Sequence, residues 1–292
     1  MIKKSYIYED GQWDIELDST LDSQNTLIVC FGSTNFDDIK EGFSELIDNF
    51  PSSKIMGCST SGEIHNDLLY SSSLSVMVMK FEKTKVALSS IEIDNIDNSF
   101  SIGSQLANQL KTDNLKSIFV LSDGLGINGS QLTKGFSSSL STEIVVTGGL
   151  AGDDANFSKT WVLVENKPVS NYVTAIGFYG ENFKIAYGSQ GGWKKFGIDR
   201  MVTQANNNIL YKLDDEPALE VYKKYLGEKS SELPASGLLY PLMIKEADSN
   251  ESKVRTILAV NEEDQSITFA GDIPNGSEVM FMKATFDELI EG

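Results

Sequence analysis

The residues whose types and spacing most clearly suggest a functional site lie at 143–154. There a β-branched run is followed by glycines and then by two adjacent carboxylates. The run Ile144–Thr147 predicts a buried strand. Three glycines follow, and because they lack a Cβ the backbone can turn tightly or admit another group: Gly148, Gly149 and Gly152. Asp153 and Asp154 would then present acceptor oxygens where the strand ends. This pattern is typical both of a pocket floor and of a simple turn, and alone it favours neither.

A second polar loop follows the predicted strand 54–58. A hydrolase nucleophile elbow needs glycines two positions before and two after the serine, and around Ser59 only Gly57 fits. The chain's single histidine, His65, lies too close in sequence to be a triad partner from a separate loop, which argues against a Ser-His-Asp enzyme. The functional interpretation is a cluster that holds the carboxylate and ammonium ends of a small polar ligand: Ser59, Thr60, Ser61 and Glu63. The alternative, given about equal weight, is a serine-rich turn that caps its own backbone.

A third polar loop, residues 122–129, follows a predicted strand and precedes a helix with two candidate N-cap residues, Asn128 and Ser130. It lacks the Lys-Ser/Thr pair of a P-loop and the glycine spacing of a dinucleotide site, so nucleotide binding is not favoured. Asp123, Asp153 and Asp154 all follow predicted strands, so they could converge on Mg²⁺ or Ca²⁺. Turn aspartates that hydrogen-bond to their own loops are the favoured interpretation.

Other candidate residues are few. One histidine and two cysteines exclude a His-rich zinc site, and no CxxC pair is present. Cys30 and Cys58 each end an apolar run and are expected to be reduced and buried, with a reactive Cys58 thiol as the alternative. Trp193 follows two glycines, and either walls a pocket or fills an interface between two parts of the chain. We predict no cofactor, and we assign no catalytic residue or metal ligand.

The composition and charge limit the classes of protein to which the chain can belong. The chain has 292 residues, 40% of them hydrophobic, and a net charge of −18 that is spread along the sequence. This charge argues against nucleic acid or a membrane surface as partner, because both need clustered Lys and Arg. No apolar run approaches the ~18–20 residues of a membrane span, and the first residues lack the apolar core of a signal peptide. We therefore expect an acidic cytoplasmic protein.

Hydrophobic periodicity predicts the elements that must position these loops. Helices are expected at 36–50, 99–110, around Leu132–Leu140, at 215–226 and from 286 onward. Short apolar runs predict strands at 27–31, 54–58, 74–81, 86–93, 117–121, 144–147, 161–165, 172–177, 183–187, 254–260, 266–270 and 279–282. Two pairs of these strands are expected to form hairpins, 74–81 with 86–93 and 254–260 with 266–270. The order predicts a mixed α/β (α+β) fold, in which helices flank mixed sheets in two packed subdomains, 1–205 and 206–292.

Taken together, these stretches resemble the FIST sensory domain, named for its occurrence in F-box and intracellular signal-transduction proteins. The matching segments are, in order, 56–64 (MGCSTSGEI), 121–125 with 128–129, 147–154 (TGGLAGDD), 191–193 (GGW), 208–217 (NILYKLDDEP), 224–227, 233–242 and 269–276 (FAGDIPNG). Each segment alone is moderately specific. The ordered set, which covers roughly residues 27–292, is specific.

The resemblance implies a sensory input domain with N- and C-terminal FIST parts, found in prokaryotes alone or fused to chemoreceptor, histidine-kinase or diguanylate-cyclase outputs. Such domains are proposed to bind small ligands such as amino acids, and the family supplies no catalytic residues to carry over. One departure is that the C-terminal FIST part normally continues beyond the point matching residue 292. We expect either a chain cut from a longer protein or a short variant.

We therefore predict a cytoplasmic sensor that binds a small polar metabolite, such as an amino acid, and relays binding to an output domain or partner protein. The predicted ligand-binding residues are Ser59, Thr60, Ser61, Glu63, Asp123, Asn128, Gly149, Asp153, Asp154 and Trp193. One alternative is a histidine-independent, metal-assisted enzyme that acts on a small metabolite. The other is a structural interaction module, which would tolerate Ser59→Ala and Asp153→Ala.

Overall fold

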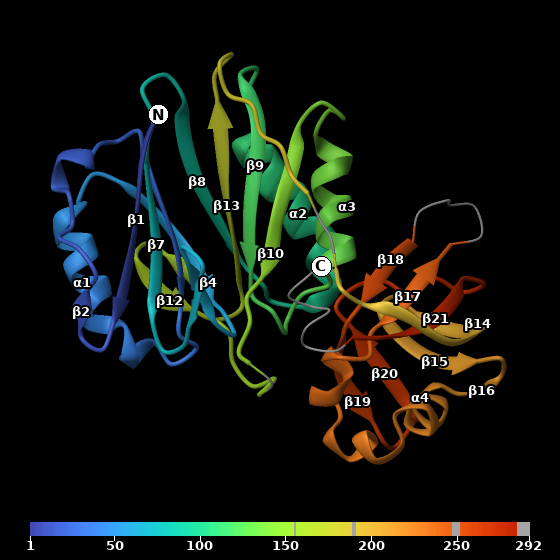
Figure 1. Ribbon diagram of the computed structural model, residues 1–292. Coiled ribbons are helices and arrows are strands. Elements are labelled where there is room, and N and C mark those ends of the chain that lie inside the picture. The colour runs from blue at the N-terminus through green and yellow to red at the C-terminus, as the bar shows by residue number, and fades with distance from the viewer. Residues whose placement is uncertain (155, 189–190, 247–251, 285–292) are drawn as a thin grey trace. The chain divides into compact units, whose positions relative to one another are not determined.

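The computed structural model describes residues 1–154, 156–188, 191–246 and 252–284 (Figure 1). It has the predicted mixed α+β character, with 42% of residues in strands and 22% in helices. The chain divides into two compact units, Met1–Ile127 with Leu132–Ala186, and Asn128–Gln131 with Tyr187–Gly292. Our expected domain boundary near residue 205 stays a prediction, and each unit is described by itself below.

The first unit is built on two sheets and a small hairpin. The seven-stranded sheet has the order β12-β11-β4-β3-β7-β1-β2. Its strands are β1 (Ile2–Glu9), β2 (Gln12–Trp13), β3 (Thr26–Gly32), β4 (Lys54–Ser59), β7 (Leu74–Lys80), β11 (Val162–Val164) and β12 (Lys167–Val169). The four-stranded sheet has the order β10-β9-β13-β8 and contains β8 (Lys85–Glu92), β9 (Leu115–Ser122), β10 (Val145–Leu150) and β13 (Tyr172–Tyr179). The hairpin pairs β5 (Glu63–His65) with β6 (Leu68–Tyr70).

These sheets form the inner layers of a helix–sheet–sheet–helix arrangement (Figure 1). Helix α1 (Lys40–Asn49) covers one face of the seven-stranded sheet, with Phe43 in a core shared with Ile28. The two sheets meet in a second core that includes Met56 and Ile176. Helices α2 (Ser99–Leu110) and α3 (Gly129–Ser139) cover the far face of the four-stranded sheet through a third core. Because β3 is covered on both faces, its sequence is an unbroken apolar run.

Within its described residues, the second unit contains an eight-stranded sheet and one α-helix. The strands are β14 (Lys194–Asn206), β15 (Ile209–Leu213), β16 (Glu216–Pro217), β17 (Leu242–Lys245), β18 (Ser252–Arg255), β19 (Ile257–Asn261), β20 (Ser266–Phe269) and β21 (Glu278–Lys283). Helix α4 (Ala218–Leu226) packs Tyr222 against Phe281, and Gly227, with φ of 58°, ends it. The hairpin predicted at 254–260 and 266–270 is present as β19–β20. Five 3₁₀ helices complete the described elements: Ser19–Leu21, Phe36–Asp38, Ile96–Asn98, Gly227–Glu232 and Ala235–Leu238.

One predicted hairpin is wrong. Strand β7 pairs with β1 and β3 in the seven-stranded sheet, whereas β8 pairs with β13 in the four-stranded sheet. The short turn between them carries the chain from one sheet to the other. The alternation of residue types along the sequence therefore identified both strands. It did not identify their partners, because a strand has the same alternation whether its neighbour lies in the same sheet or in the facing one.

Three further expectations differ from the structure or fall outside it. Residues 183–187 form no strand, and Phe183 instead stacks on Phe178 with ring centroids 4.6 Å apart. The run 144–147 is not buried, because β10 is the edge strand of its sheet and its side chains are half-buried or exposed. The helix expected from residue 286 lies outside the described residues. No described helix combines the length and apolar character that crossing a membrane requires.

Candidate functional site

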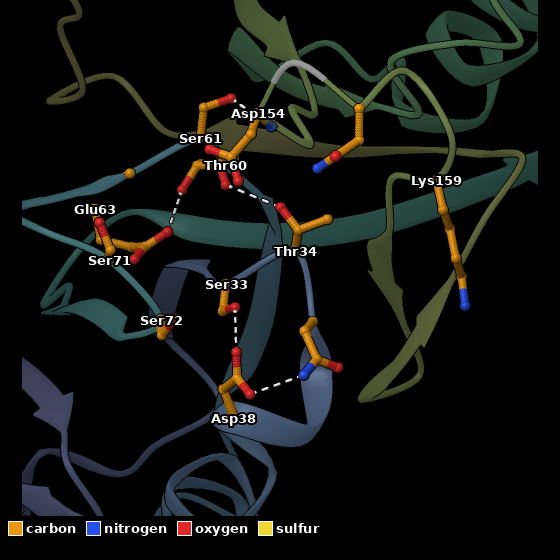
Figure 2. Close-up of a pocket in the computed structure, with 13 residues that line it drawn as sticks. Ser33, Thr34, Asp38, Thr60, Ser61, Glu63, Ser71, Ser72, Asp154 and Lys159 are labelled. Carbon is orange, nitrogen blue, oxygen red and sulfur yellow. Dashed lines mark hydrogen bonds between the residues drawn. The ribbon is translucent and has the colours of Figure 1, made fainter.

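A cavity of about 360 Å³ lies in the first unit, at the carboxyl ends of the parallel strands β3 and β4 (Figure 2). Parallel strands end at the same edge of a sheet, so the loops that follow them converge there. Its volume is in the range of small-molecule sites. We call it the polar cavity, because every side chain that lines it is polar: Ser33, Thr34, Asn35, Asp38, Thr60, Ser61, Glu63, Ser71, Ser72, Asp154, Asn156 and Lys159, with Gly62.

Trp161 fixes the two strand ends that form the base of the polar cavity. Its indole N–H donates to the Ser33 carbonyl at 3.0 Å, and its backbone N–H donates to Ser59 Oγ at 3.1 Å. The Thr60 N–H donates across to the Gly32 carbonyl at 3.0 Å. The loops after β3 and β4 are therefore held by a buried aromatic side chain and do not depend on a ligand for their shape.

Glu63 is the most buried ionisable side chain of the polar cavity, with 1% of its surface exposed. Thr60 Oγ1 donates to Glu63 Oε1 at 2.7 Å, and the hydroxyl and backbone N–H of Ser73 donate to Oε2 at 2.8 and 3.3 Å. Burial of a carboxylate is costly unless it is hydrogen-bonded, and these three donors meet that need. Glu63 is thereby held in one position at the wall of the polar cavity.

Asp38 and Asp154 contribute two more carboxylates. Asp38 accepts from Ser33 Oγ at 2.9 Å and from Asn35 Nδ2 at 2.8 Å. Asp154 is exposed, and its backbone N–H donates to Ser61 Oγ at 2.9 Å. Figure 2 shows this contact joining the loop after β10 to the loop after β4.

Asp153 builds the loop that brings Asp154, Asn156 and Lys159 to the polar cavity. Its side chain is buried and accepts three backbone N–H groups, from Phe157 at 3.2 Å, Ser158 at 2.7 Å and Lys159 at 3.0 Å. Its carboxylate does not line the polar cavity. The structure thus gives Asp153 the role of a turn aspartate that organises its own loop.

Asp123 has the same kind of role at the end of β9. It accepts from the N–H groups of Leu125 and Gly126, from the Asn171 N–H and from Thr160 Oγ1, all at 2.9–3.0 Å. A carboxylate has about four acceptor positions, so the loop fills them. Among the described residues, no group of three or more His, Cys, Asp or Glu side chains is placed to hold a metal ion. The aspartates therefore give no geometric support to the metal-assisted alternative.

The remaining predicted residues are not among those that line the polar cavity. Ser59 is fully buried against Trp161, and Gly149 lies on the exposed edge strand β10. Asn128 belongs to the second unit, where its Oδ1 accepts from the Ser130 and Gln131 N–H groups as the N-cap of α3. Trp193 also belongs to the second unit.

Comparison with known proteins decides the family. A FIST N domain model matches residues 26–216, and a FIST C domain model matches residues 218–292. The chain belongs to the FIST family. FIST domains are sensory domains linked to signal transduction. The chain is also similar to the uncharacterized protein MJ1623 of Methanocaldococcus jannaschii, at 24% identity over 293 residues. That match covers 87% of this chain and 53% of the relative, so the chain spans about half the length of MJ1623.

Two of the segments that resemble FIST proteins meet at the polar cavity. Segment 56–64 supplies Thr60, Ser61 and Glu63, and segment 147–154 supplies Asp154. The ends of these segments are joined by a bond of 2.9 Å from the Gly152 N–H to the Ser59 carbonyl. In this FIST domain the four residues are therefore placed around one space, while their role in binding stays a prediction.

Besides Gly62, the predicted ligand-binding residues did not include eight residues whose side chains line the polar cavity: Ser33, Thr34, Asn35, Asp38, Ser71, Ser72, Asn156 and Lys159. A signal was available for the first four. They follow the first predicted strand as Ser59–Glu63 follow the second, and parallel strands joined by a helix bring such loops together. No comparable signal marks Lys159, because its position depends on how Asp153 folds its loop.

The two cysteines are free and buried, as predicted. Burial raises the pKa of the Cys58 thiol to about 12, and it raises the pKa of Cys30 further, with the neighbouring Cys58 as a second cause. Because the thiolate is the reactive form, Cys58 at neutral pH is held in its unreactive state. The alternative of a reactive thiol beside the cavity loop is thus not supported.

Proposed function

We propose that this FIST chain is a cytoplasmic sensory input module that binds a small polar metabolite of the amino-acid class in the polar cavity. In this proposal it relays binding to an output domain or partner protein and catalyses no reaction itself. The observation that carries the proposal is a cavity of about 360 Å³ that is lined by polar residues and one glycine, inside a domain of a sensory family. Its partners include neither nucleic acid nor membrane, in keeping with the net charge of −18. The two free, buried cysteines fit a reducing compartment.

The hairpin β5–β6 connects the polar cavity to an exposed surface, so it could transmit the effect of ligand binding to a partner. Both of its ends line the polar cavity, through Gly62 and the first hairpin residue Glu63 at one end and through Ser71 and Ser72 after the other end. Its tip carries side chains that are more than half exposed, Ile64, Leu68 and Leu69. A ligand that contacts both ends of the hairpin would bias its position, which is the differential contact that a population shift requires.

A thermal-shift screen against polar metabolites tests the proposed function. A ligand present at 100 times its dissociation constant adds about 2.7 kcal/mol to the free energy of unfolding, which raises the melting temperature by several degrees. The matched control is the double variant Asp154→Asn, Lys159→Met, which changes two exposed side chains of the polar cavity. We expect a hit to lose most of its shift in this variant. A broad screen without a hit on folded protein, or a hit unaffected by the double variant, would contradict the proposal.

A further inference from the structure

We infer that the ligand of the polar cavity is a small organic cation, an amine or guanidine with a net positive charge. This inference rests on the proposed function and narrows it to one chemical class. It follows from the charges of the lining, from the direction of its hydrogen bonds, and from the burial of one carboxylate.

The charges of the polar cavity are unbalanced. Its lining contains three carboxylates, Asp38, Glu63 and Asp154, and a single ammonium, that of Lys159. Elsewhere in this acidic chain carboxylates have cationic neighbours, as Glu262 has Lys223 at 2.6 Å. Within the described ranges, however, none of the three cavity carboxylates forms an ion pair. The protein therefore leaves an excess of negative charge for a ligand to neutralise.

The hydrogen bonds of the lining give an independent indication. A hydroxyl has one proton to donate, and three cavity hydroxyls donate theirs to protein oxygens: Ser33 to Asp38, Thr60 to Glu63, and Thr34 to the Thr60 carbonyl at 3.3 Å. The amides each use one of their two N–H groups in the same way, since Asn35 donates to Asp38 and Asn156 to the Asp153 carbonyl. With their protons engaged, the hydroxyls of Ser33, Thr34 and Thr60 can only accept from a ligand. This suits a ligand that brings N–H donors to the part of the polar cavity that holds Asp38 and Glu63.

Glu63 is the strongest single feature. Its carboxylate has about four acceptor positions, and the protein fills three, all with neutral donors. A ligand N–H at the fourth position would form a charge-assisted hydrogen bond in a buried setting, where such bonds are strong. A neutral or anionic ligand would leave this buried charge without a counter-ion.

Lys159 defines a second end of the ligand site. Figure 2 draws Lys159 and Glu63 on opposite sides of the view, from different loops. The Lys159 backbone N–H donates to Asp153, but its side-chain ammonium forms no ion pair within the described part of the chain, so it can bind an anionic group. A cation that also carries one carboxylate, as basic amino acids do, would satisfy both ends, whereas a diamine would use only the acidic end.

Titration calorimetry with a charge-matched panel tests this inference. The titrations are done at low salt, about 50 mM, where ionic contacts are weakly screened. L-lysine is compared with L-norleucine, which lacks the terminal ammonium, and L-arginine is compared with L-citrulline, in which a neutral urea group replaces the guanidinium. 1,5-Diaminopentane and L-glutamate extend the range of ligand charge. We expect a cationic member to bind at least ten times more tightly than its neutral partner. This preference should weaken as salt is raised, because ionic contacts are screened.

Two variants test whether the preference for cationic ligands comes from the carboxylates of the polar cavity. Glu63→Gln removes the charge at nearly constant volume and is expected to reduce the cation preference at least tenfold. Where Glu63→Gln folds poorly, Asp154→Asn tests the same point at an exposed carboxylate that accepts no hydrogen bond from the described residues. The inference is overturned if a neutral or anionic member binds best, if no cation binds to folded protein, or if the preference survives in both variants. A neutral or anionic ligand lost in the Asp154→Asn, Lys159→Met control would leave the proposed function standing while this inference falls.

Discussion

Replacement of Asp153 by asparagine is expected to lower the free energy of unfolding by about 2–3 kcal/mol and to abolish ligand binding at the polar cavity. The variant loses the negative charge that three backbone N–H groups share, those of Phe157, Ser158 and Lys159. An asparagine can present only one oxygen, so at least one N–H would face an amide donor. Asp153 does not line the polar cavity, but the loop that it organises carries Lys159. A disturbed loop would therefore displace Lys159 and so disrupt binding indirectly.

The neighbouring Asp154→Asn is the matched control for stability. Asp154 is exposed and its carboxylate accepts no hydrogen bond from the described residues, so we expect a change within about 0.5 kcal/mol. Asparagine also tolerates the φ of 58° at this position. Urea unfolding followed by circular dichroism measures both variants. Equal stabilities would show that Asp153 does not organise the loop, and the structural account of this site would be wrong.

Gly148→Ala is expected to destabilise the first unit by about 3 kcal/mol, because the added methyl group would meet the backbone of the neighbouring strand. A Cβ at Gly148 would lie 1.9 Å from the Val120 carbonyl oxygen on the paired strand β9. The obstacle is backbone, so it cannot rotate away, and β10 would have to separate locally from β9. Unfolding in urea again provides the measurement.

Gly149→Ala is the control, because no atom lies within 4 Å of the Cβ it would add. Alanine restricts the unfolded chain more than glycine does, so this variant should leave the free energy of unfolding unchanged or raise it by about 0.4–1 kcal/mol. Two adjacent glycines of one motif thus have opposite expected outcomes. If both variants are equally destabilised, the close approach of β10 to β9 is not the reason for glycine at 148.

Part of the fold could be predicted because several of its elements are locally encoded. The 3.6-residue pattern of 99–110 gives α2, and the unbroken apolar run 27–31 gives β3. Strand partners are not encoded in this way. The alternation of β7 and β8 is the same whether they pair or lie in facing sheets, so the predicted hairpin was wrong. Strand β1 was missed because only its second half is buried, and its first residues look like a polar terminus.

The site was predictable in part for the same reason. Thr60, Ser61, Glu63 and Asp154 were singled out because polar groups follow apolar strands, and they do line one cavity. The same reasoning could not separate Asp154 from Asp153 or Asp123. Whether a carboxylate faces a cavity or its own backbone depends on where the next few N–H groups point, and only the folded loop shows this.

A crystal structure of the protein with the highest-affinity ligand from the screen would show whether the polar cavity is the binding site. We expect the ligand in the polar cavity, with a donor within hydrogen-bond distance of Glu63 and further contacts to Asp154 or Lys159. Ligand bound at another place in the molecule, with the polar cavity holding only solvent, would contradict this expectation.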